Sequence, residues 1–188
     1  MTRLAEKWLK WRGWRFVGEM PELDRMIIIG APHTSNWDFV AYLAAIRHWR
    51  FSPRFVGKHT LFRWPFGYFF RRFGGIPVDR TRPGGMVGQV VEEFEKRERM
   101  ILVMAPEGTR KAAPHWKSGF IRIAAEAGVP ILPAYIHFPR KEVVLGTPIT
   151  FEGDEKALME RLRRFYEAGE GKDGEGKGPV RLEKERSV

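Results

Sequence analysis

The chain contains no cysteine among its 188 residues. That absence excludes disulfide bonds, thiolate metal sites and a cysteine nucleophile, and it leaves the redox compartment open. The chain also lacks any run of about 18 to 20 apolar residues, the length that a membrane-spanning helix needs. Its N-terminus is charged and has no apolar core of the kind found in signal peptides. We therefore expect a cytoplasmic protein, and one that lies on a membrane surface remains compatible with this expectation.

Acidic residues are in the minority, because 23 Asp and Glu oppose 33 Lys and Arg and give a formal net charge of +10. A basic surface attracts partners that contain phosphate, such as nucleic acid, anionic lipid or a phosphorylated metabolite. General solubility is the plainer explanation of the same charge. Charge alone does not choose among these explanations, so the choice depends on particular residues.

Buried-strand and helix patterns alternate along the chain, which predicts an α/β fold. One domain is the default at this length, so we expect a single domain with a mixed, mostly parallel sheet flanked by helices. Predicted strands cover residues 26–29, 54–57, part of 74–80, 100–104, 129–137 and 142–151, and predicted helices cover residues 38–49, 86–99, 117–127 and 154–168. The helix over 38–49 is expected to present Phe39, Tyr42, Leu43 and Ile46 on one face. Gly128 is expected to end a helix and Asp154 to cap one.

The two ends of the chain differ in composition from its middle. We divide it into an amphipathic, Trp-rich and basic N-terminal segment (1–25), a folded domain (26–168) and a Gly-, Lys- and Glu-rich tail (169–188) that we expect to be disordered. Trp8, Trp11 and Trp14 recur every three residues, and tryptophans mixed with basic residues suit the headgroup region of a bilayer. The same tryptophans fit a cap over the protein's own core, so both interpretations stay open. A second aromatic and basic stretch spans residues 60–73.

A candidate base follows the first predicted strand, where Asp38 stands five residues after His33. On a continuous helix this spacing puts the two on different faces, so we expect His33 in the loop and Asp38 in the first helical turn. The carboxylate can then bind one imidazole nitrogen and leave the other to take a proton. A helix-dipole Asp beside a surface histidine is the alternative. With no cysteine and no Gly-x-Ser-x-Gly elbow, the simplest group for such a base to deprotonate is a substrate hydroxyl.

A candidate anion-binding turn, Glu107-Gly108-Thr109-Arg110, follows the predicted strand over residues 100–104. Gly108 permits a tight turn and close approach of the backbone to a ligand. Arg110 can form two parallel hydrogen bonds with phosphate, and Thr109 adds a hydroxyl group and an amide. An ordinary turn at a strand end, with solvated charges, is the alternative.

Three further cations, Lys58, Arg80 and Lys117, stand near the ends of predicted strands or helices. Ligands in open α/β sheets collect at the carboxyl ends of strands, so cations that converge there would form a phosphate site. Each of these charges alone also fits a solvated surface. The remaining histidines lack the spacing of metal ligands, so we expect no metal; they are His48, His59, His115 and His137.

These residues, in this order, resemble the glycerolipid acyltransferase family, which includes the lysophosphatidic acid (1-acylglycerol-3-phosphate) acyltransferases. The family pattern of His, any four residues and Asp (HX4D) is similar to His33–Asp38. A glycine-rich turn and strand that end on Arg resemble residues 74–80, Glu-Gly-Thr-Arg resembles residues 107–110, and Val-Pro-Ile followed by Pro resembles residues 129–133. The resemblance extends from about residue 26 to residue 151.

The resemblance implies an O-acyltransferase of phospholipid biosynthesis. Its donor would be an acyl thioester, either acyl-CoA or acyl carrier protein, and its acceptor a hydroxyl of a lysophospholipid or glycerol phosphate. It implies no metal and no bound cofactor. Lipid substrates imply peripheral contact with an anionic membrane, at the inner face of the cell membrane.

The resemblance also implies a role for each candidate. His33 would be the general base and Asp38 would orient it. Arg80 and Arg110 would hold the acceptor phosphate. The remaining candidates would shape that pocket or stand where similar sequences have lysines: Glu107, Gly108 and Thr109 in the first group, Lys58 and Lys117 in the second.

Two alternatives differ in their substrate or class. An acyltransferase for a non-phosphorylated or glycolipid acceptor keeps the same chemistry, and it predicts that phosphate-free acceptors work equally well. A basic nucleic-acid-binding protein follows from the net charge of +10 and the interleaved aromatic residues. That class predicts steeply salt-dependent binding and gives no reason for the His33 and Asp38 pair.

Overall fold

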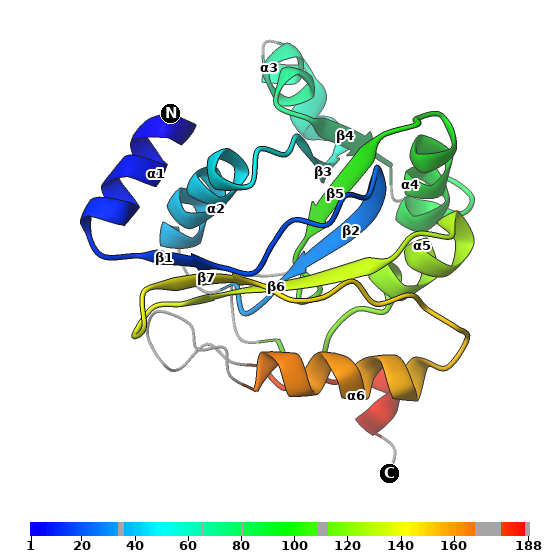
Figure 1. Ribbon diagram of the computed structural model, residues 1–188. Helices are drawn as coiled ribbons and strands as arrows, with labels where there is room; N and C mark the ends of the chain where they lie inside the picture. The colour runs from blue at the N-terminus through cyan, green and yellow to red at the C-terminus, as the bar shows by residue number, and fades with distance from the viewer. Residues whose placement is uncertain (34–35, 65, 80, 109–112, 168–177, 187–188) are drawn as a thin grey trace.

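A computed structural model of the chain describes residues 1–33, 36–64, 66–79, 81–108, 113–167 and 178–186 (Figure 1). The strands are β1 (Arg15–Val17), β2 (Arg25–Gly30), β3 (Pro53–Lys58), β4 (Gly75–Val78), β5 (Met100–Met104), β6 (Ile131–His137) and β7 (Glu142–Leu145). They form one sheet in the order β1-β7-β6-β2-β5-β3-β4. The five strands from β6 to β4 are parallel, and β7 is antiparallel to β6. The predicted α/β class and mostly parallel sheet are confirmed.

Helices cover both faces of this sheet. The α-helices are α1 (Thr2–Trp11), α2 (Trp37–His48), α3 (Phe66–Arg72), α4 (Gly85–Glu95), α5 (Gly119–Ala127) and α6 (Glu155–Tyr166), with short 3-10 helices η1 (His59–Phe62) and η2 (Glu183–Arg186). Figure 1 shows α1 beside α2 on one face of the sheet and α6 on the other, with α4 and α5 packed together. No helix within the described ranges is long and apolar enough to span a bilayer.

Strand β2 is the centre of the core because both of its faces are covered. Met26 and Ile28 belong to the apolar cluster on the side of α2, and Ile27 and Ile29 belong to the cluster on the side of α4, α5 and α6. All four side chains are at most 4% exposed. Burial of each such side chain contributes about 1.5–3 kcal/mol. The continuous Met-Ile-Ile-Ile run therefore specifies a central parallel strand, as its unbroken hydrophobicity predicts.

Local sequence signals set two helix ends as predicted. Gly128 ends α5 in the left-handed conformation, with φ of 62°. Asp154 precedes α6, and its side chain accepts a hydrogen bond of 3.0 Å from the Ala157 N–H. Both features satisfy backbone groups that a helix end otherwise leaves unpaired.

The most deeply buried side of α2 is not the face that holds its large apolar residues. Its buried residues are Asp38, Ala41, Ala44 and Ala45, whereas Phe39 is 59% exposed. The three alanines form a shallow surface that admits α1 closely, and Leu9 of α1 is buried in the same cluster. Close helix–helix packing therefore requires small side chains on this side of α2. A count of large apolar residues along one face does not detect such a contact.

The three N-terminal tryptophans differ in their surroundings. Trp14 packs against the cluster beneath α1 and meets the Phe138 ring edge-on at 5.3 Å. Trp8 stacks on Trp37 at 5.7 Å, at the start of α2. Trp11 is 78% exposed. Trp14 thus belongs to the core, and Trp11 presents its ring to the surroundings.

The aromatic stretch over residues 60–73 is anchored by one ring and exposes several others. Phe62 is buried, and a Cβ added to Gly75 would lie 2.8 Å from its ring. The close approach of β4 to this ring therefore needs glycine at position 75. The large apolar residues around it are exposed: Leu61, Trp64, Tyr68, Phe69 and Phe73. We call these five residues the α3 surface.

The tail departs from its predicted disorder over the part that the structure describes. Residues 168–177 lie outside the described residues. Residues 178–186 pack against α6 and the segment before α5, where Leu182 is 2% exposed and forms a parallel bridge with Trp116. Val180 and Leu182 supply the apolar contacts that low-complexity composition conceals.

Enlarging one buried alanine tests the packing of α1 on α2. Ala44 is fully buried, so Ala44→Leu forces the helices apart and should lower the free energy of unfolding by about 1–3 kcal/mol. Phe39→Leu, on the exposed side of the same helix, should change it by less than about 0.5 kcal/mol. Urea unfolding followed by circular dichroism measures both. Equal effects of the two substitutions would contradict the assigned face.

Candidate active site

The candidate residues follow four neighbouring parallel strands. His33 follows β2, Glu107 follows β5, Lys58 ends β3 and Arg80 follows β4. Because these strands are adjacent in the order β2-β5-β3-β4 and run in the same direction, their carboxyl ends meet at one edge. Ligands in open α/β sheets bind at this edge. Three predicted residues, Arg80, Thr109 and Arg110, lie outside the described residues.

His33 and Asp38 form the pair that their spacing predicts. The His33 Nδ1 atom lies 3.0 Å from Asp38 Oδ2, with Asp38 in the first turn of α2. The His33 side chain is 33% exposed, whereas that of Asp38 is 8% exposed. A dry carboxylate therefore faces one ring nitrogen, and the tautomer that donates Nδ1–H to it leaves Nε2 able to accept a proton.

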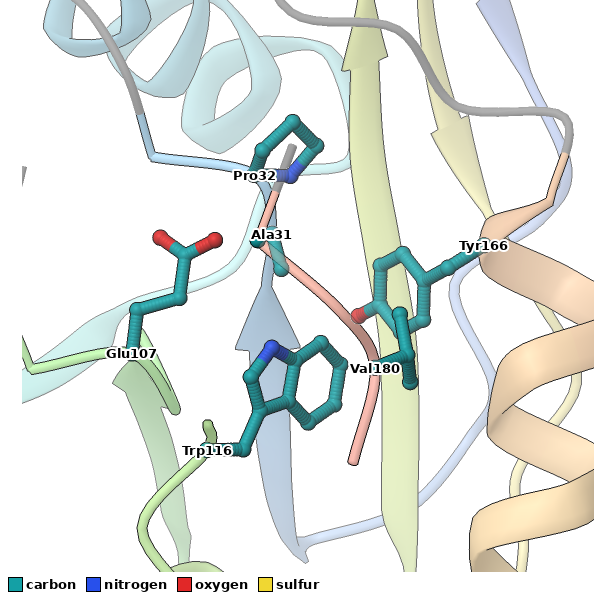
Figure 2. A pocket seen from close by; sticks show the side chains of 7 residues that line it. Ala31, Pro32, Glu107, Trp116, Tyr166 and Val180 are labelled. Carbon is teal, nitrogen blue, oxygen red and sulfur yellow. The ribbon is translucent and has the colours of Figure 1, made fainter. Parts of the chain in front are cut away.

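Glu107 holds the backbone of the same histidine. The His33 N–H donates a hydrogen bond of 2.9 Å to Glu107 Oε2. Glu107 is 4% exposed, and its carboxylate points toward the loop that begins at Pro32 (Figure 2). The sequence resemblance assigned this residue to the acceptor pocket. In the structure it contacts the main chain of the candidate base.

Gly108 and Lys117 come together beside Glu107. Gly108 has φ of 65°, and a Cβ added there would meet Lys117 Nζ at 3.0 Å. The Lys117 N–H donates a hydrogen bond of 2.9 Å to Pro106 O, which holds these two residues together. Lys117 is exposed and therefore accessible to an anionic ligand. The structure thus brings these two candidate residues side by side.

Asp79, which directly follows β4, is held by hydrogen bonds from two directions. The Asp79 N–H donates to Gln89 Oε1 at 3.0 Å, and Gln89 Nε2 donates to Asp79 O at 2.6 Å. Asp79 Oδ1 accepts hydrogen bonds from the Thr81 N–H and hydroxyl group at 2.9 and 2.7 Å. Lys58 pairs in register with Val78, so it lies beside the end of β4. Gln89 received no role from sequence, because its contact depends on where α4 packs.

Two aromatic residues that sequence reasoning missed lie beneath the His33 loop. Figure 2 shows Trp116 and Tyr166 converging on Ala31 and Pro32 from separate elements. The Tyr166 hydroxyl donates to Ile29 O at 2.6 Å and accepts from the Ala134 N–H at 3.2 Å. Burial raises the pKa of Tyr166 well above its usual range, so the phenol stays neutral. It therefore serves as a fixed link between α6 and the ends of β2 and β6.

The electrostatics of Glu107 differ from those of a surface carboxylate. Burial raises the pKa of Glu107 above its ordinary value, and the negative charge of Asp38 acts in the same direction. The hydrogen bond from the His33 N–H and the charge of His33 oppose this shift. Within the described residues, no group of three or more His, Asp or Glu side chains is arranged to hold a metal ion.

Comparisons with known proteins agree with this arrangement. Residues 15–137 match the family model described as Acyltransferase. A 1-acyl-sn-glycerol-3-phosphate acyltransferase from Streptococcus pneumoniae is 32% identical over 116 residues, which are 61% of this chain and 43% of that protein. This chain therefore spans less than half the length of that relative.

A solved structure shares the fold. The 1-acyl-sn-glycerophosphate (LPA) acyltransferase PlsC from Thermotoga maritima superposes with a TM-score of 0.59, covering 91% of this chain and 81% of that one. The sequence identity is 22%, so this likeness shows the fold alone.

The pH dependence of stability tests the environment of Glu107. A raised pKa means that the folded state binds the proton more tightly than the unfolded state, so stability falls as pH rises from the ordinary value of 4.5 through the raised value. Glu107→Gln cannot ionise, and its Oε1 still accepts from the His33 N–H. Its free energy of unfolding relative to wild type should increase over that pH window.

Urea unfolding at a series of pH values measures this difference. Glu19→Gln, at an exposed position, is the matched control for removal of one carboxylate. A Glu107→Gln difference that stays constant with pH, or that decreases as pH rises, would contradict the buried environment.

Proposed function

This chain belongs to the acyltransferase family, and we propose that it moves a fatty acyl group from an acyl thioester to a hydroxyl of a glycerol-phosphate-type lipid such as lysophosphatidate. The observation that carries the proposal is the His33–Asp38 pair at the carboxyl edge of the sheet, 3.0 Å apart. The named activities of the Streptococcus pneumoniae and Thermotoga maritima proteins support the same substrate class. The donor would be acyl-CoA or acyl carrier protein, with no metal or bound cofactor.

His33 acts as the general base in this proposal. Its Nε2 takes the proton from the acceptor hydroxyl while the hydroxyl oxygen attacks the thioester carbonyl carbon. Collapse of the tetrahedral intermediate forms the ester and breaks the carbon–sulfur bond. The imidazolium then gives the proton to the leaving thiolate. Asp38, buried beside Nδ1, holds the ring in the required tautomer and stabilises the imidazolium.

Cations at the neighbouring strand ends bind the acceptor phosphate. Lys117 lies against Gly108 on the β5 side of the edge, and Lys58 lies beside the end of β4. We assign Arg80 and Arg110 to the same phosphate, because Arg80 stands two residues after β4 and Arg110 belongs to the segment that follows β5. Thr109 supplies a hydroxyl group within the same loop. Phosphate recognition distinguishes this proposal from an enzyme that accepts phosphate-free lipids.

The α3 surface is the proposed contact with the membrane. Trp64 is 94% exposed and Tyr68 is 80% exposed, and three exposed arginines, Arg63, Arg71 and Arg72, accompany them. Residues 61–73 contain no Asp or Glu. Exposed aromatic rings beside positive charge suit the interface of an anionic bilayer, here the inner face of the cell membrane.

Removal of the candidate base tests the reaction. His33→Ala should lower the rate of thiol release from acyl-CoA, in the presence of lysophosphatidate and detergent, by at least about 10²-fold. His48→Ala removes a histidine at the far end of α2 and should retain the wild-type rate. Equal rates for wild type and His33→Ala would contradict the mechanism. Equal use of phosphate-free acceptors by wild type would contradict the phosphate site.

Loss of two exposed rings tests the membrane contact. The double variant Trp64→Ala, Tyr68→Ala should bind vesicles of phosphatidylglycerol and phosphatidylcholine at least about 10-fold more weakly, because a buried large apolar side chain contributes about 1.5–3 kcal/mol. The matched control is Val17→Ala, Leu23→Ala, which removes exposed apolar groups away from α3. Vesicle sedimentation measures both. Unchanged binding of the first variant would exclude the α3 surface.

A further inference from the structure

The C-terminal segment lies against the candidate active site although no catalytic pattern points to it. Residues 178–186, which we call the C-terminal strap, pass beside Ala31 at the end of β2, and Val180 and Trp116 lie on either side of the same space (Figure 2). A small cavity of about 10 Å³ lies there. Its lining residues are Ala31, Pro32, Glu107, Trp116, Tyr166, Gly178 and Val180. The strap therefore forms part of the wall that faces Glu107.

The strap is bonded to the segment between Glu107 and α5. The Trp116 N–H donates to Arg181 O at 2.7 Å, and Trp116 bridges to Leu182 in parallel. The Arg181 Nε–H donates to Pro114 O at 3.3 Å. Gly178 lies so close that an added Cβ would be 2.4 Å from Ala113 O. The strap therefore holds residues 113–116 through one backbone hydrogen bond at Trp116, one side-chain hydrogen bond to Pro114 and close packing at Ala113.

The other side of the strap is bonded to α6. The Arg163 Nε–H donates to Val180 O at 3.0 Å, and Arg163 Nη2 lies 2.5 Å from Glu185 Oε1. Glu185 Oε2 accepts from the Leu182 N–H at 2.8 Å. A half-buried carboxylate that satisfies both a guanidinium and a backbone N–H resists displacement by water. Glu185 is therefore the residue that locks the strap onto the helix.

Trp116 lies between the strap and Glu107, because it bonds to the strap and lines the same cavity as Glu107. It is 1% exposed, it meets Tyr166 edge-on at 5.2 Å, and Figure 2 shows its indole nitrogen turned toward the side of Glu107. Glu107 in turn accepts the His33 N–H. Displacement of the strap would remove the contacts that hold Trp116 and would open the cavity that Trp116 shares with Glu107, Ala31 and Pro32.

We propose that the C-terminal strap is a positioning element of the active site, acting on His33 through Trp116 and Glu107. The effect on kcat rests on the proposed acyl transfer, whereas the effect on hydrogen exchange does not. A base displaced by about 1 Å loses up to about 10² in rate, so the strap controls kcat. The acyl donor contacts none of the strap residues in this proposal, so its KM stays near the wild-type value.

Two substitutions that each remove one carboxylate distinguish positioning of the active site from a general loss of negative charge in the strap. Glu185→Ala removes the contacts with Arg163 and the Leu182 N–H, whereas Glu183 is 78% exposed and pairs with His115 at 3.6 Å. Full-length Glu185→Ala should show amide hydrogen exchange at least about 10-fold faster in residues 31–38 and 105–117, with β5 and β6 unchanged. Its kcat should fall about 10-fold while KM changes less than about 2-fold. Glu183→Ala should match wild type, and Glu185→Gln, which keeps acceptor oxygen, should restore most of the loss.

The outcomes separate the strap from the proposed reaction. Faster exchange confined to residues 178–186 overturns the inference, and so does a uniform rise across the sheet, which marks a stability element only. Faster exchange at residues 31–38 with unchanged kcat also overturns it. Faster exchange at residues 31–38 in a protein that releases no thiol from any tested donor supports the strap and contradicts the proposed function instead.

Discussion

Two buried carboxylates hold His33, and the rest of the site is arranged around that constraint. Asp38 lies 3.0 Å from the ring nitrogen Nδ1, and Glu107 accepts the main-chain N–H at 2.9 Å. One carboxylate comes from the helix that follows β2, and the other comes from the end of the neighbouring strand β5. The parallel pairing of β2 with β5, in register from Arg25 with Met100 to Ile29 with Met104, therefore determines whether the histidine has both supports.

The carboxylates that contact His33 are buried, whereas the cations near it are accessible to solvent. Asp38 and Glu107 are 6% and 4% exposed, so their contacts are little weakened by water. Lys58 and Lys117 are exposed at neighbouring strand ends, where a phosphate can reach them. This division suits a reaction in which rigid groups orient the base and flexible cations receive a charged acceptor. The C-terminal strap lies on the dry side, and it therefore belongs with the supports rather than with the substrate contacts.

The features that the sequence predicts well are local. The Met-Ile-Ile-Ile run, the glycine after α5 and the Asp cap of α6 each depend on a few adjacent residues, and each has the predicted structure. The HX4D pair is local too, since five positions separate its members. The sequence also predicts that the site lies on an open parallel sheet, because alternating strands and helices permit few topologies.

The features that the sequence predicts poorly depend on distant packing. The buried face of α2 consists of alanines because α1 packs there, and the sequence of α2 alone favours its large residues. Glu107 contacts a backbone N–H 74 positions away, a contact that no local pattern encodes. The strap is concealed by its neighbours in sequence, since Val180 and Leu182 are two apolar residues at the end of a Gly- and Lys-rich stretch. In each case the missing information is which surface the segment meets.

The tautomer of His33 tests the central claim most directly. Nitrogen-15 NMR of the neutral imidazole distinguishes a protonated nitrogen from a bare one. We expect a proton on Nδ1, donated to Asp38, and a bare Nε2 that accepts the substrate proton; in Asp38→Asn this preference should be lost. A wild-type ring protonated on Nε2, or an unchanged tautomer in Asp38→Asn, would contradict the role of Asp38 and with it the assignment of His33 as the base.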